Sequence, residues 1–173
     1  MLRSALPGLD AVLGLFDYRH PIDSLIRDFK FHRDMAALRA CAEILENAVS
    51  SHLQDVDLVL PVPLGRKRYR ARAYNQAAML AAPLARALNR PLAVDTVRRI
   101  SERGAQSLLA PGDRRANIRG VFRVDVPVAG LNVLLIDDVL TTGSTLTELG
   151  RLLRRNNARS VKALALAVSP LLP

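Results

Sequence analysis

Two short apolar runs constrain the fold of this chain more than any other feature of its sequence. Residues 57–62 (Asp-Leu-Val-Leu-Pro-Val) and 133–136 (Val-Leu-Leu-Ile) show no alternation of apolar and polar side chains. A strand with one face in water alternates, whereas a strand that is buried on both faces does not. Both runs therefore predict strands inside a parallel sheet, whose two faces must be covered by other elements.

Helical and extended patterns alternate along the rest of the chain. Apolar residues at helical spacing predict helices that begin at Pro21 and that cover about residues 34–49, 75–88 and 144–156. Pro83 is expected to kink or divide the third of these helices. Further strands are expected at 92–94, 120–124 and 161–168, and an extended segment or short strand at 16–19. This order predicts an α/β fold with right-handed crossovers.

Length and composition indicate one globular domain. The 173 residues suffice for one core, and no apolar run is long enough to span a bilayer. The first sixteen residues lack the basic start and the long apolar stretch of a signal peptide. The single cysteine, Cys41, excludes an internal disulfide and a cysteine zinc site within this chain, and its helical neighbours suggest a buried apolar role. We therefore expect a cytoplasmic protein.

The net charge of +9 favours polyanionic partners such as phosphates, nucleotides or nucleic acid. The alternative is that the arginine-rich composition reflects the base composition of the genome. Aromatic residues make up only 4% of the chain and tryptophan is absent. A single-strand binder that depends on base stacking would have more of them.

The second apolar run is followed by two acids and then by a turn of small residues. The adjacent carboxylates of Asp137 and Asp138 repel each other, so a ligand should gain from both: the two hydroxyls of a ribose, or Mg²⁺ held through water. In Thr141-Thr142-Gly143-Ser144-Thr145, backbone N–H groups and the start of a helix suit a phosphate. Together they predict a sugar-phosphate site. The alternative is an exposed turn with an ordinary Ser or Thr helix cap.

Residues 133–145 resemble the signature with which type I phosphoribosyltransferases bind phosphoribosyl pyrophosphate (PRPP). The resemblance implies a parallel sheet flanked by helices, with residues 1–50 as a small N-terminal helical hood and 51–173 as the core of the same domain. It also implies that Asp137 and Asp138 contact the ribose hydroxyls, and that residues 141–145 hold the 5-phosphate. Mg²⁺ would be held by the two acids and PRPP, with no direct protein metal site. Homodimers are common in the superfamily.

A narrower resemblance covers most of the chain. Several segments are similar to the ComF/GntX family of competence-associated, phosphoribosyltransferase-like proteins. They are Phe29-Lys30-Phe31, Val62-Pro63-Leu64, Arg68, Arg72, Asn75-Gln76, Gln106, Arg114, Asn117 and Phe122. Where that family usually has glycine and an aromatic residue, this chain has Ala73-Tyr74, and alanine would be strained if the backbone φ there is positive. The four-cysteine zinc module of many members is absent, so no function of that module is implied here.

Two basic segments lie beside the predicted site. Strand order suggests that the segment after residue 62 faces the pyrophosphate of PRPP, and arginine suits phosphate through its paired donors. The candidates on this side are Arg66, Lys67, Arg68, Arg72, Asn75 and Gln76. Residues 98–119 correspond to the mobile flap of the superfamily, in which Arg103, Gln106 and Arg114 are candidates for contact with pyrophosphate. The alternatives are a solvated basic turn and a surface loop with incidental charge.

Two functional hypotheses follow. In the first, the protein is a phosphoribosyltransferase (a glycosyltransferase) that releases pyrophosphate as a nucleophile attacks C1 of the ribose. In the second, it is a non-catalytic module that senses PRPP or a nucleotide, or that binds single-stranded DNA during DNA uptake in competence. The two are compatible. The sequence selects no acceptor and no catalytic acid or base, and its three histidines lack metal-ligand spacing.

Overall fold

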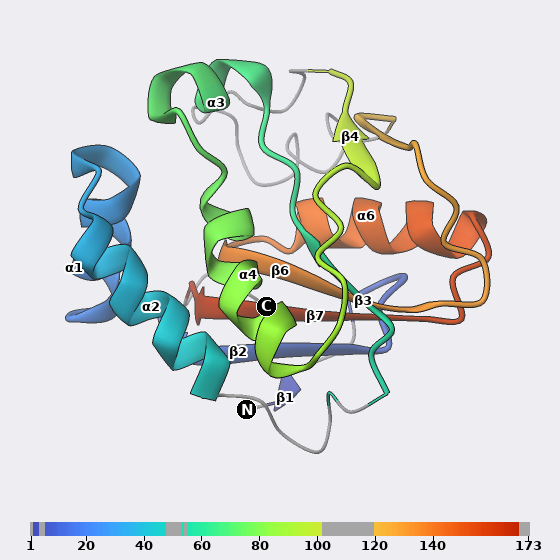
Figure 1. Cartoon of the computed structure of the whole chain (residues 1–173), viewed down its shortest axis with the longest axis horizontal. Helices are drawn as coiled ribbons and strands as arrows, with labels where there is room; N and C mark the ends of the chain where they lie inside the picture. The colour runs from blue at the N-terminus through green and yellow to red at the C-terminus, as the bar shows by residue number, and fades with distance from the viewer. Residues whose placement is uncertain (1, 4–5, 48–52, 54, 102–119, 170–173) are drawn as a thin grey trace.

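A five-stranded sheet forms the centre of the computed structural model, which describes residues 2–3, 6–47, 53, 55–101 and 120–169 (Figure 1). Its strand order is β1-β2-β7-β6-β3. β2 (Ala11–Asp17), β7 (Ser160–Val168), β6 (Asn132–Leu140) and β3 (Leu58–Pro61) are parallel, and β1 (Leu2–Arg3) adds an antiparallel edge. The expected parallel sheet is therefore confirmed; the run 133–136 lies in β6, and the run 57–62 contains β3, which pairs with β6 at the edge of the sheet.

Two hydrophobic layers cover the sheet because alternate residues of its buried strands point to opposite faces. Val133 and Leu135 pack with α6 (Ser144–Arg155) and with a small antiparallel sheet of β4 (Val97–Arg99) and β5 (Phe122–Val124). Leu134 and Ile136 pack on the other face. That face is covered by α1 (Ile22–Arg27), the π-helix η1 (Asp28–His32), α2 (Met35–Asn47) and α4 (Gln76–Ala87). None of the described helices is long and apolar enough to cross a membrane.

The N-terminal part of the chain contributes more to the sheet than the sequence predicts. β2 spans residues 11–17 instead of an extended segment at 16–19, and it pairs with β7 over most of its length. Gly14 permits this pairing, since a Cβ atom there would lie 2.0 Å from Cγ2 of Val168. The boundary at residue 50 stays a prediction, but β2 joins the first fifty residues directly to the main sheet.

The structure differs from the local expectations in several places. The basic segment after β3, for which no helix was predicted, is a helix, α3 (Arg66–Arg72), and Pro83 lies inside α4 without dividing it. The strand expected at 92–94 is reduced to one bridge between Leu92 and Val59. The next strand is β4, which pairs with β5 outside the main sheet. Proline removes one helix hydrogen bond, which the packing of the α4 apolar face against the core outweighs.

Candidate functional site

The acidic pair lies in the part of β6 that extends beyond the end of the neighbouring strand β3. β3 ends at Pro61, which pairs with Ile136, whereas β6 continues to Leu140 and pairs there with β7 alone. The sequence placed Asp137 and Asp138 after the strand, but they lie within it, at an edge left open by the end of β3. This is the carboxyl end of the parallel strands, where ligands of open α/β sheets bind.

Burial and neighbouring charges together set the pKa of Asp137. Burial, and after it the adjacent charge of Asp138, raise this pKa to about 7 although the charges of Lys30 and Arg68 act in the opposite direction. The backbone N–H of Asp138 donates to Oδ1 of Asp137 over 2.9 Å. Two adjacent carboxylates at a buried position need positive charge or hydroxyl donors beside them to be ionised together.

Lys30 supplies one of these positive charges from the N-terminal segment. Its Nζ atom donates to Oδ1 of Asp138 over 2.8 Å, and the two side chains are 16% and 13% exposed. Lys30 was not among the site residues predicted from the sequence. It belongs to the segment Phe29-Lys30-Phe31, which resembles the family, but a sequence match does not show where a side chain lies.

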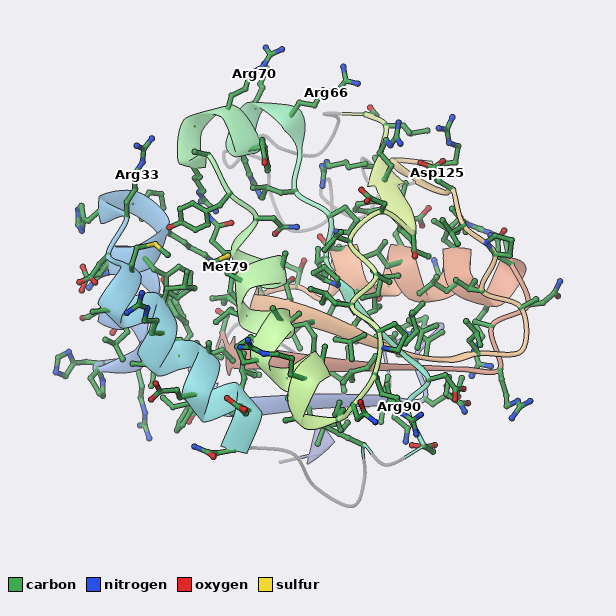
Figure 2. All side chains as sticks on the ribbon, viewed as in Figure 1. Arg33, Arg66, Arg70, Met79, Arg90 and Asp125 are labelled. Carbon is green, nitrogen blue, oxygen red and sulfur yellow. The ribbon has the colours of Figure 1, made fainter. Side chains whose placement is uncertain are left out.

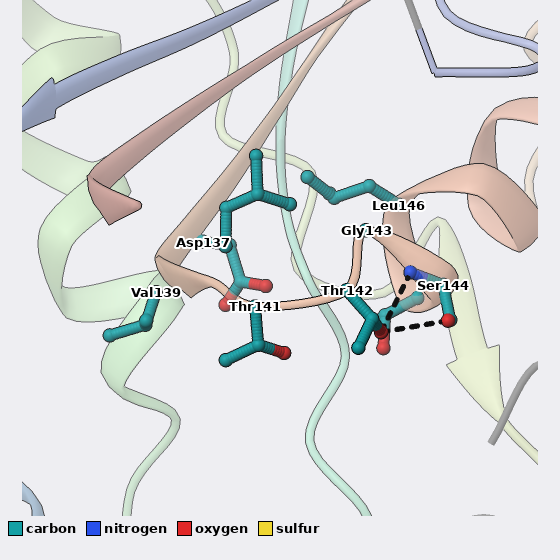
Figure 3. Close-up of a pocket in the computed structure, with 9 residues that line it drawn as sticks. Asp137, Val139, Thr141, Thr142, Gly143, Ser144 and Leu146 are labelled. Atoms are coloured by element: carbon teal, nitrogen blue, oxygen red, sulfur yellow. Dashed lines mark hydrogen bonds between the residues drawn. The ribbon is translucent and has the colours of Figure 1, made fainter. Parts of the chain in front are cut away.

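The turn after β6 forms a pocket together with the acidic strand end (Figure 3). The pocket is lined by Asp137 and residues 139–146. Figure 3 shows the carboxyl group of Asp137 and the hydroxyls of Thr142 and Ser144 around this turn, and the two hydroxyls are 2.8 Å apart. Gly143 precedes α6 with a left-handed φ of 69°, and it has no side chain to cap the helix. The N-terminus of α6 therefore faces the pocket with small residues only, which suits an anion.

The side chain of Leu6 lies close to Gly143 in this turn. A Cβ atom on Gly143 would lie 2.5 Å from Cδ1 of Leu6, so no larger residue fits without movement. The positive φ and this close approach together explain why glycine stands in the middle of the turn.

The basic candidates of α3 divide into two groups. Arg68 and Arg72 lie close enough to the acidic pair for their charges to act on it: Arg68 lowers the pKa of Asp137, and Asp138 acts on Arg72. Burial lowers the pKa of Arg72 itself, whose guanidinium lies 5.4 Å from the ring centre of Phe31. Arg66 extends into solvent, as does Arg70 (Figure 2). Lys67 is also exposed.

Asn75 and Gln76 begin α4. The Asn75 side chain accepts from the N–H of Ala77 and donates to the carbonyl of Val62, each over 3.1 Å. It thereby fixes the connection between β3 and α4. Gln76 is 1% exposed, and its Nε2 atom has no hydrogen-bond partner among the residues that the structure describes. Both residues stay predictions as pyrophosphate contacts.

Ala73 adopts the strained geometry that the sequence comparison with glycine suggested. Its φ is 69° at the C-terminal end of α3. The N–H of Ala73 donates to the carbonyl of Tyr69 over 2.7 Å, which closes the helix. The following Tyr74, in the connection between α3 and α4, donates through its hydroxyl to the carbonyl of Phe29, and so joins this connection to η1.

The flap candidates Arg103, Gln106 and Arg114 lie outside the described residues. Within the described ranges, no group of three or more His, Cys, Asp or Glu side chains could hold a metal ion by itself. The chemical core of the site thus consists of two carboxylates, which need a ligand or counter-ions, and of a helix N-terminus beside them.

In this sheet, a strand that ends in two acids is followed by a turn of small residues and then by a helix. This arrangement is that of the phosphoribosyltransferase class of α/β proteins. The profile of the phosphoribosyl transferase domain matches residues 74–170. The chain belongs to the phosphoribosyltransferase domain family, on its ComF- and YhgH-like branch.

Curated relatives cover nearly the whole chain. The chain is 34% identical over 161 residues to the DNA utilization protein YhgH of Salmonella typhimurium, which covers 90% of this chain and 71% of the relative. It is 34% identical over 169 residues to competence protein F of Haemophilus influenzae, covering 93% and 74%. It is 29% identical over 157 residues to competence protein ComFC of Bacillus subtilis, covering 88% and 62%.

Solved structures agree on the fold. A purine phosphoribosyltransferase from Pyrococcus horikoshii matches with a TM-score of 0.51 at 18% identity, covering 78% of this chain and 77% of that chain. An orotate phosphoribosyltransferase from Aeropyrum pernix matches with a TM-score of 0.50 at 24% identity, covering 79% and 62%. This chain therefore spans less than two thirds of the length of the second enzyme.

Proposed function

We propose that this protein binds PRPP, with the ribose hydroxyls on Asp137 and Asp138 and the 5-phosphate at residues 141–145. The observation that carries the proposal is the single pocket in which Asp137 and the start of α6 lie together. Carboxylates accept hydrogen bonds from a diol, and a helix N-terminus binds a phosphate. One sugar phosphate uses both features at once, whereas a free phosphate or a free sugar uses only one.

The cations beside the acidic pair suit the pyrophosphate end of the same ligand. Arg68 and Arg72 both act electrostatically on the pair, and arginine binds phosphate oxygens through paired donors. In a transfer reaction, the lone pair of an acceptor atom attacks C1 of the ribose while the C1–O bond breaks and its electrons leave with pyrophosphate. These arginines would hold the departing pyrophosphate and stabilise its charge.

Magnesium fits the site as a partner of the ligand. The described residues offer two adjacent carboxylates but no complete set of metal-binding side chains. Mg²⁺ prefers oxygen ligands and keeps several waters, so one or two carboxylates and the phosphates of the substrate are its usual surroundings. When bound, it would neutralise charge on the pyrophosphate and between the two acids.

Calorimetry of PRPP and Mg²⁺ tests the proposal. We expect the wild type to bind and the double variant Asp137→Asn/Asp138→Asn to lose binding. Asp55→Asn is the matched control, because Asp55 lies at the opposite, amino end of β3 and pairs with Lys162 at the surface. A folded wild type that does not bind PRPP under these conditions contradicts the proposal. Release of pyrophosphate in the presence of candidate bases then tests the transferase activity.

A second candidate function, binding of single-stranded DNA, is favoured by the exposed face of α3. Arg66 and Arg70 extend from it into solvent (Figure 2). Tyr69, three residues after Arg66 on the same helix, is 52% exposed. Such a surface can contact a phosphate backbone and stack on a base. The names of the relatives, DNA utilization and competence proteins, agree with a role of this chain in DNA uptake.

Salt dependence separates this candidate from the first. We expect a labelled oligonucleotide to bind much more weakly at about 200 mM than at about 50 mM salt. Arg66→Glu/Arg70→Glu should abolish binding, whereas Arg86→Glu/Arg90→Glu, with the same change of charge on exposed residues at the other end of α4, should not. Equal losses in the two double variants would show that net charge alone is responsible.

A further inference from the structure

The contact between Lys30 and Asp138 occupies one carboxylate oxygen of the acidic pair. Oδ1 of Asp138 accepts from Lys30, and Oδ1 of Asp137 accepts from the N–H of Asp138. Among the described residues, these are the hydrogen bonds that the two carboxylates make. In this part of the chain, each carboxylate therefore has a second oxygen, Oδ2, that can accept from a further donor. Each of the two acids can thus accept from one of the two neighbouring hydroxyls of a ribose.

The position of Lys30 is itself fixed by the contacts of its neighbours in η1. The carbonyl of Phe29 accepts from the hydroxyl of Tyr74, and the ring of Phe31 lies against the guanidinium of Arg72. One residue after η1, Arg33 donates to the carbonyl of Ala71 over 3.3 Å. The π-helix is thus attached on both sides of Lys30 to the end of α3 and to the residues that follow it, which fixes the backbone from which the lysine side chain extends.

We propose that Lys30 is a specificity-determining positioning residue, which holds the carboxylate of Asp138 in the orientation with which the site favours a ribose phosphate over a phosphate without a diol. This inference rests on the proposed function. The Asp138 side chain is only 13% exposed and its Oδ1 atom is 2.8 Å from Nζ of Lys30, so without this partner the carboxylate would rotate. Rotation moves an acceptor away from a ribose hydroxyl. Lys30 does not line the pocket formed by Asp137 and residues 139–146, so the phosphate end, residues 141–145, should keep its affinity.

The contribution of the diol to binding is tested with two phosphate monoesters that have the same charge, only one of which carries a diol. Ribose 5-phosphate and methyl phosphate are titrated into the wild type and into Lys30→Met, Lys30→Arg and Arg27→Met. Arg27→Met is the matched control, because the partners of Arg27 among the described residues, Asp23 and Ser24, belong to its own helix, and its side chain is 56% exposed. A hydrogen bond to a charged group contributes about 1.5 to 3 kcal/mol, so its loss corresponds to about tenfold or more in affinity.

We expect the wild type to favour ribose 5-phosphate, and Lys30→Met to lower that preference about tenfold while its affinity for methyl phosphate is unchanged. Lys30→Arg should restore most of the preference, and Arg27→Met should behave as the wild type. Retained binding of methyl phosphate shows that the variant is folded at the site. A preference in Lys30→Met that equals or exceeds that of the wild type overturns the inference, and so does an equal loss for both esters. A wild type that binds neither ribose 5-phosphate nor PRPP refutes the proposed function instead.

Discussion

Replacement of Gly143 by alanine tests two physical reasons for the glycine in the phosphate turn. Its left-handed φ of 69° costs an alanine about 1–2 kcal/mol, of which the lower entropy of the unfolded chain offsets about 0.4–1 kcal/mol. The new Cβ atom would also lie 2.5 Å from Cδ1 and 2.9 Å from Cδ2 of Leu6. Displacement of a packed side chain costs about 1–3 kcal/mol. We therefore expect Gly143→Ala to lower the free energy of unfolding by about 2 kcal/mol.

A second substitution separates the two contributions. Leu6→Ala removes the obstructing methyl groups, and because Leu6 is only half-buried it should cost about 1 kcal/mol, less than the 2–5 kcal/mol of a fully buried leucine. In this background Gly143→Ala should cost only about 1 kcal/mol, the backbone contribution. The coupling in this double-mutant cycle, measured by urea unfolding, should thus be about 1 kcal/mol. Equal costs of Gly143→Ala in both backgrounds would refute the role assigned to Leu6.

Three further predictions concern other parts of the site. Ala73→Gly should stabilise the protein by about 0.5–1 kcal/mol in urea unfolding, because it relieves a left-handed alanine at the cost of some backbone entropy; a loss of stability would contradict this. Tyr74→Phe should destabilise it by about 1 kcal/mol in the same assay, since the bond to the carbonyl of Phe29 is lost, and an unchanged midpoint would argue against that bond. The third prediction concerns pH. The folded protein raises the pKa of Asp137 to about 7, so between about pH 4 and 7 it holds a proton that the unfolded chain has released. Stability should therefore fall across this range as pH rises, whereas Asp137→Asn should lack this slope; parallel pH profiles of the two proteins would show that Asp137 is not responsible.

Local patterns in the sequence predicted the parts of the fold that depend on burial. The run 133–136 has no polar position, so only a strand covered on both faces accommodates it, and it lies in β6. α6 begins at Ser144, as its small residues and leucine spacing predicted. The expected strain at residue 73 is confirmed by its positive φ, and there the departure from glycine was the only clue.

Other local patterns misled because tertiary contacts outweigh them. No helix was predicted for the basic segment 66–72, yet arginine and lysine favour helices well enough for α3 to form there. β2 was largely missed because its stretch of the chain is half-buried and interrupted by Gly14. A glycine weakens a strand pattern, but here it makes room for Val168 of the neighbouring strand.

The sequence by itself determined the local chemistry of the candidate site: two acids and a turn of small residues, directly after a buried strand. These residues are neighbours in the chain, so their grouping needs no knowledge of the fold. Only the tertiary structure decided what surrounds them. Lys30 lies 108 positions from Asp138 in the sequence, and no periodicity connects the two. Their contact follows from the packing of η1 and α2 on one face of the sheet, where the burial of many apolar side chains outweighs the loss of solvation of one ion pair.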